Sequence, residues 1–82
     1  MKNITTQQIK AARMLLEWGQ VDLAREAFVG VATLRRIETI PGVISDQTAS
    51  FKKIVAALEA VGIEFLGSSE RDHGVRLISK ED

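Results

Sequence analysis

Residues 20–39 read QVDLAREAFVGVATLRRIET, and this stretch decides the fold of the chain. Its apolar residues recur at helical spacing in two short groups, which predicts two helices separated by a tight turn. The positions expected to face the core are Leu23, Ala24 and Ala27 on the first helix and Leu34 and Ile37 on the second. Val29 lies in the turn, where it can fill the angle between the helices. This is the layout of a helix-turn-helix motif.

The second helix of the motif, expected over residues 30–39, has an outer face suited to DNA. By helical period that face carries Val31, Ala32, Arg35 and Arg36. In helix-turn-helix proteins the second helix enters the major groove, where arginine bonded to guanine is the commonest specific contact. Arg35 and Arg36 point about 100° apart, so one can reach a base while the other binds a phosphate. The plainer interpretation is two solvated arginines on an exposed helix.

Several segments carry a resemblance to a known family. They read IKAARMLLEWGQVDLA at residues 9–24, TLRRIE at residues 33–38, and ALEAVGIEF followed by GVRL nearer the C-terminus. On these residues the chain resembles the XRE family of lambda-repressor-like and Cro-like helix-turn-helix regulators. The resemblance implies a mainly α, lambda-repressor-like bundle of about four helices with a short C-terminal β-hairpin. It also implies a transcriptional regulator that binds double-stranded DNA as a homodimer.

The resemblance assigns roles to individual residues as well. The expected DNA-contacting residues are Gln20, Val31, Ala32, Thr33, Arg35 and Arg36. Among them, Gln20 would bond a phosphate and Arg36 would reach into the groove; the alternative for Gln20 is a solvated residue at a helix start. Arg13 and Glu38 would form a structural ion pair across the fold, and the alternative is two unlinked surface charges.

Some residues depart from the family pattern and favour a second interpretation. Phe28 stands where the family usually has glycine, and Gly30 stands where it usually has a serine or threonine helix cap. Val31 and Ala32 replace polar base-reading residues. The formal net charge is zero, although residues 1–38 carry +2 and residues 39–82 carry −2. The alternative function is therefore a protein-interaction module with weak or no DNA binding, whose apolar surface is made by Phe28, Val31 and Ala32.

Composition limits the functional class further. The chain has 82 residues, enough for one small globular domain, and no cysteine, which excludes a disulfide framework and a thiolate metal site. With a single histidine, no metal and no cofactor are expected. No apolar run has the length of a membrane span, and no signal-peptide core is present, which predicts a cytoplasmic protein without membrane contact. No catalytic grouping is visible, so neither an enzyme nor a small-molecule substrate is expected.

Two further helices and a hairpin are expected around the motif. The first helix is predicted over residues 5–18, begun by a Thr5–Gln8 capping box. Its expected buried stripe is Ile9, Ala12, Leu15 and Leu16, with Trp18 closing the helix. Ile40–Ile44 is predicted to be a loop, because Pro41-Gly42 is a strong turn signal. The last helix is predicted from a cap at Ser45 or Asp46 to about Val61, with an apolar stripe of Phe51, Ile54, Val55, Leu58 and Val61.

The C-terminal residues have the period of β-strands. Residues 1–62 are interpreted as the DNA-binding part and residues 63–82 as a hairpin extension with strands at 63–66 and 75–78. The strands would place Ile63, Phe65, Val75 and Leu77 on one face. A two-stranded hairpin is marginal alone, so this face either pairs with a second copy in a homodimer or folds back over Phe51 and Leu58.

Overall fold

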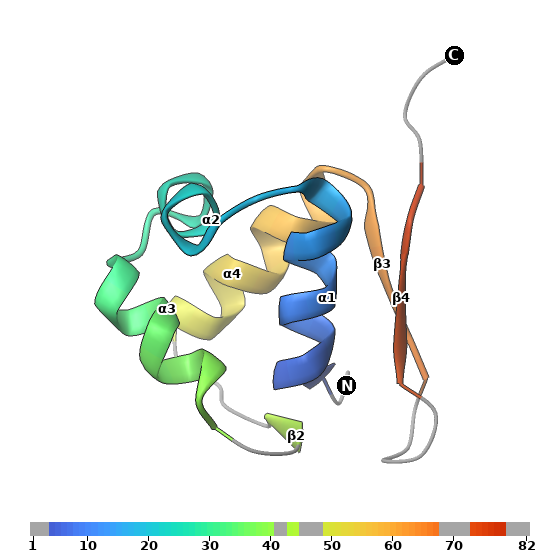
Figure 1. The fold of residues 1–82 in the computed structure, drawn as a ribbon, viewed down its shortest axis with the longest axis horizontal. Helices are drawn as coiled ribbons and strands as arrows, with labels where there is room; N and C mark the ends of the chain where they lie inside the picture. The colour runs from blue at the N-terminus through green and yellow to red at the C-terminus, as the bar shows by residue number, and fades with distance from the viewer. Residues whose placement is uncertain (1–3, 41–42, 45–48, 68–72, 79–82) are drawn as a thin grey trace.

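The computed structural model describes residues 4–40, 43–44, 49–67 and 73–78 (Figure 1). Its helices are α1 (Thr6–Leu16), α2 (Gln20–Ala27), α3 (Val31–Glu38) and α4 (Ala49–Ala60). Its strands are β1 (Ile4–Thr5), β2 (Val43–Ile44), β3 (Ile63–Leu66) and β4 (Gly74–Leu77). The described part of the chain is thus mainly helical, with a C-terminal antiparallel hairpin, which confirms the coarse fold class. The predicted caps at Ser45 or Asp46 and the Pro41-Gly42 turn lie outside the described residues.

Helix α1 begins with the predicted capping box. The Thr5 hydroxyl accepts a hydrogen bond from the Gln8 backbone N–H at 3.0 Å, and the Gln8 Oε1 accepts one from the Thr5 N–H at 2.8 Å. Helix α2 begins differently, because Gly19 has no side chain and the Asp22 carboxylate instead accepts from the Gly19 N–H at 2.8 Å. That bond and the neighbouring Arg25 guanidinium lower the pKa of Asp22 below its usual value.

Helices α1 and α2 end in the same way, and neither end has glycine. The residues after them, Glu17 and Phe28, have φ angles of 58° and 59° in the left-handed region. After α2, the Phe28 N–H donates to the Arg25 carbonyl and the Val29 N–H donates to the Ala24 carbonyl, which is a Schellman motif. Left-handed backbone costs a residue other than glycine about 1–2 kcal/mol. Packing of the following residue, Trp18 or Val29, against the core opposes this cost.

The residues predicted as a loop after α3 contain a short strand, so that prediction was wrong in part. Val43 pairs with Thr5 and Ile44 with Ile4 in the antiparallel β1–β2 ladder. Two-residue strands are too short to show an alternating pattern, and their partners lie about half the chain apart. The ladder joins the start of α1 to the segment that follows α3.

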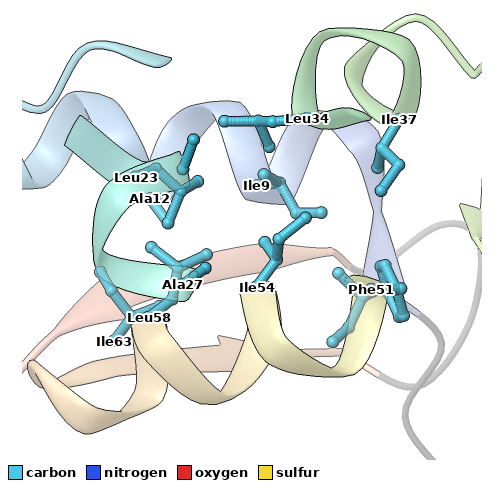
Figure 2. Close-up of a cluster of buried hydrophobic side chains, with 12 residues drawn as sticks. Ile9, Ala12, Leu23, Ala27, Leu34, Ile37, Phe51, Ile54, Leu58 and Ile63 are labelled. Carbon is cyan, nitrogen blue, oxygen red and sulfur yellow. The ribbon is translucent and has the colours of Figure 1, made fainter. Parts of the chain in front are cut away.

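The core lies between α1 and α4, where side chains from all four described helices and β3 converge (Figure 2). Its fully or nearly buried members are Ile4, Ile9, Ala12, Leu23, Ala24, Ala27, Leu34, Ile37, Phe51, Ile54, Leu58 and Ile63. The prediction that Leu15 is buried was wrong, because 45% of its surface is exposed. Leu15 lies two helical turns after Gln8, on the flank of α1 facing the hairpin rather than on the core-facing stripe of Ile9 and Ala12. Val55 on α4 and Val61, the residue after α4, are only half-buried.

The hairpin packs on the helices of its own chain, β3 against α4 and β4 against α1. In Figure 1 it stands beside α1, on the side of the bundle away from α2 and α3. Glu64 and Arg76 are opposite one another in the register and form an exposed ion pair. Gly62 turns the chain from α4 into β3 at a φ of 105°, and a Cβ there would collide with the Ile78 carbonyl oxygen. Glycine is therefore required at this turn.

Candidate nucleic-acid interface

The candidate interface is built on α2, the three-residue turn Phe28–Gly30, and α3. The turn is held by the Schellman bonds described above, and half-buried Val29 packs into the core between the helices. Gly30 has ordinary extended backbone and precedes α3 without a side-chain cap. Leu34 and Ile37 are buried, so one face of α3 is held against α1 and α2. The opposite face of α3 is consequently fixed in orientation.

That opposite face is smaller and more basic than the sequence indicated. Ala32, Arg35 and Arg36 are exposed, whereas Thr33 is half-buried. Val31 does not face outward as expected: it is half-buried and packs against the core. Val31 precedes Leu34 by three residues and so shares its side of the helix. The two arginines therefore dominate the exposed surface of α3.

Arg13 and Glu38 form an ion pair beneath this face. Arg13 Nε donates to Glu38 Oε2 at 2.8 Å, and Arg13 Nη2 donates to Glu38 Oε1 at 3.0 Å. The side chains are 15% and 2% exposed, respectively, so the pair is largely removed from solvent. Arg13 Nη1 also donates to the Trp18 carbonyl at 3.1 Å, which ties the end of α1 to the pair. Bidentate pairing of this kind orients both partners strongly.

Two more residues extend the pair to the surface. Gln20 Nε2 donates to Glu38 Oε1 at 2.9 Å, and Gln20 Oε1 accepts from Arg35 Nε at 3.3 Å. We call Arg13, Glu38, Gln20 and Arg35 the Glu38 network. Sequence reasoning found the first pair but missed both bonds of Gln20, because the partners lie 15 and 18 residues away. The available signal was the spacing of Arg35 and Glu38, which places both on one side of α3.

Phe28 lies beside the interface rather than on α3. Its side chain is 85% exposed, the most exposed large apolar residue among those described. It borders an open hollow of about 500 Å³ between α2 and α4. The other lining residues are Glu26, Ala27, Lys53, Ala56 and Ala57. Phe28 and α3 residues Val31 and Ala32 therefore do not form the common apolar surface that the alternative function assumed, because Val31 is turned toward the core.

A smaller hollow of about 150 Å³ lies between the start of α1 and the hairpin, and Gln8 and His73 line it. His73 Nε2 is buried there without a hydrogen-bond partner. Among the described residues, no three His, Asp or Glu side chains are grouped as metal ligands.

Comparison with known proteins does not assign the chain to a family. No family model matches the chain, and no curated protein matches it. Within the described ranges, no helix has the length and apolar character needed to span a membrane. Function is therefore inferred from the geometry and charge of α2, α3 and the Glu38 network.

Proposed function

We propose that the protein is a sequence-specific regulator of transcription with a lambda-repressor-like helix-turn-helix fold. In this proposal α3 enters the major groove of double-stranded DNA, and α2 lies across the backbone. The observation that carries it is the exposed Arg35–Arg36 pair on a helix whose other face is fixed in the core. Further support comes from the short α2–α3 turn and from the excess of basic residues in residues 1–38. Guanidinium groups provide both phosphate neutralisation and guanine recognition.

Replacement of the two arginines tests this proposal. A preferred site is first selected from a library of random duplexes, and affinities are then measured by fluorescence anisotropy at fixed salt. Arg36→Ala is expected to cost about 1–3 kcal/mol on the selected site and to remove preference at one base pair. Arg35→Ala is expected to weaken binding to all duplexes alike and to reduce the salt dependence by about one charge.

Arg76→Ala is the matched control, because Arg76 is an exposed arginine on β4 that pairs with Glu64 and lies on the hairpin, outside α2, α3 and the Glu38 network. It is expected to bind every duplex like the wild type. If the Arg35 and Arg36 variants also bind like the wild type, or if no duplex is enriched in the selection, DNA recognition by α3 is refuted.

We further propose that the regulator is a two-fold homodimer. A dimer can place two recognition helices about 34 Å apart, one turn of DNA, whereas a single copy reads only a few base pairs. Large apolar side chains are exposed on α1 and along the end of the hairpin, at Met14 (73%), Leu15 (45%), Leu77 (41%) and Ile78 (46%). Helix α1 and β4 are in contact, so these residues belong to one side of the molecule. A second copy would remove this surface from water.

Sedimentation equilibrium at micromolar concentration tests the dimer. The full chain is expected to sediment as a dimer and Met14→Lys to shift it toward monomer, because a charge would be buried in the contact. Val21→Lys is the control, since Val21 is 56% exposed on α2 and away from this surface. A monomeric wild type, or equal dissociation of both variants, would contradict the proposed interface.

The alternative function, a protein-interaction module, is supported by one observation. Phe28 exposes 85% of its surface beside the hollow between α2 and α4, although the left-handed backbone there disfavours a large residue. A fold under no constraint at this position would favour glycine. The exposed ring and the hollow beside it together form an apolar surface that a protein partner could cover.

Replacing Phe28 with glycine measures the backbone strain directly. Phe28→Gly is expected to raise the free energy of unfolding by about 0.5–1 kcal/mol: relief of the left-handed backbone exceeds the added freedom of the unfolded chain. Phe28→Ala keeps the Cβ and is expected to stay within about 0.5 kcal/mol of the wild type. Urea denaturation measures both. A loss above 1 kcal/mol in both variants would show that the exposed ring contributes to the core.

A further inference from the structure

We infer that Gln20 and Glu38 are positioning residues for Arg35, and that Gln20 acts on DNA through Arg35. In the Glu38 network, the buried Arg13–Glu38 pair holds the Gln20 amide, and the Gln20 amide in turn orients the Arg35 guanidinium at the surface. That the Arg35 guanidinium binds a DNA phosphate rests on the proposed function. The orientation of Arg35 in the free protein does not.

The network is anchored on a buried carboxylate. Glu38 is 3% exposed, and its carboxylate receives two bonds from Arg13, whose own position is fixed by the Trp18 carbonyl. The end of α1 and the end of α3 are therefore joined through one carboxylate. Because Glu38 Oε1 also accepts from Gln20, the start of α2 is joined to the same group.

The chemistry of its neighbours determines the orientation of the Gln20 amide. A carboxylate only accepts hydrogen bonds and a guanidinium only donates them. The amide nitrogen of Gln20 must therefore face Glu38, and the amide oxygen must face Arg35, as their distances of 2.9 and 3.3 Å indicate. A flipped amide would lose both bonds at once. Glutamine at this position thus binds the buried Glu38 carboxylate at one end and presents an oxygen to Arg35 at the surface at the other.

This arrangement predicts how Arg35 binds. Its Nε is engaged by Gln20, which leaves the two terminal nitrogens as the free donors. Two parallel N–H groups match two oxygens of a phosphate, and an arginine that is already oriented loses less rotamer freedom on binding. Gln20 gives one amide N–H to Glu38 and accepts from Arg35 through its amide oxygen, so both ends of the amide are held in the network and one N–H remains.

The first test uses the free protein and needs no DNA. In ¹⁵N–¹H spectra of arginine side chains, the Arg35 Nε–H is expected to be shifted and slowed in solvent exchange relative to Arg36. Gln20→Met keeps the length of the side chain and removes the amide, so it is expected to move the Arg35 signal to the position of a solvated arginine. Gln7→Met is the matched control, since Gln7 is exposed on α1, and it should leave that signal unchanged.

The second test measures binding to mixed-sequence duplexes. Gln20→Met is expected to weaken binding about three- to tenfold in the wild type and less than twofold in the Arg35→Ala background. The reason is that Gln20 affects binding by orienting Arg35, and this effect is lost when Arg35 is absent. A direct phosphate bond from Gln20 would give equal losses in both backgrounds and would overturn the inference. So would an Arg35 signal insensitive to Gln20→Met. If the NMR coupling is present but the wild type binds no duplex, the positioning of Arg35 stands and the proposed function fails.

Discussion

Arg13→Ala is expected to lower the free energy of unfolding by about 3–5 kcal/mol, because it leaves the Glu38 carboxylate buried without its bidentate partner. Small domains are stable by only about 5–15 kcal/mol, so the loss should be a large fraction of the stability of the chain. Urea denaturation followed by Trp18 fluorescence measures the change. The reason for the size of the effect is burial: the Glu38 side chain is only 2% exposed.

Two variants test whether the loss comes from leaving the Glu38 charge buried and unpaired. The double variant Arg13→Met, Glu38→Leu removes both charges and is expected to recover most of the loss, since apolar residues often replace buried ion pairs at little cost. Arg25→Ala breaks an ion pair whose side chains are 65% and 42% exposed, and is expected to change stability by less than about 1 kcal/mol. A loss no larger for Arg13→Ala than for Arg25→Ala would show that Glu38 is hydrated in solution.

Gln8→Ala is expected to lower the free energy of unfolding by about 2–4 kcal/mol. Gln8 is 3% exposed and takes part both in the capping box of α1 and in the contact between α1 and the hairpin. Its Oε1 caps Thr5, while its Nε2 donates to the carbonyl oxygens of Leu66 at 3.0 Å and Gly74 at 2.8 Å. The variant removes one side of the capping box and the two hydrogen bonds that join α1 to the hairpin, each worth about 1 kcal/mol. Thermal or urea unfolding measures the total.

Gln8→Glu distinguishes the two roles. Its carboxylate can still accept from the Thr5 N–H, but it has no donor for the hairpin and faces two carbonyl oxygens with a negative charge. Hydrogen exchange should therefore accelerate in β3 and β4 while the first turn of α1 stays protected. Gln7→Ala, at an exposed neighbouring position, is expected to stay within about 0.5 kcal/mol of the wild type. Equal acceleration throughout the chain would mean that the hairpin and α1 unfold together.

Local signals in the sequence predicted the helix ends to within two residues, apart from the start of α4, whose predicted caps lie outside the described residues. The capping box needs residues only three positions apart, and the core faces of α2, α3 and α4 follow from the 3.6-residue period. The hairpin strands followed equally from alternation, to within one residue: Gly74–Leu77 against the predicted 75–78. The resemblance placed Phe28 at a position that usually holds glycine, and the structure has left-handed backbone there.

Tertiary structure alone decided which residues meet across the fold. The β1–β2 ladder, the hold of Gln8 on the hairpin and the bonds of Gln20 all join residues far apart in the chain. Periodicity assigns a side chain to a direction around its helix, but not to the neighbour found in that direction. That is why Leu15 and Val31, at the margins of their faces, were misjudged. Which neighbour a marginal or polar side chain meets depends on how the helices pack, and packing is set by the whole core at once.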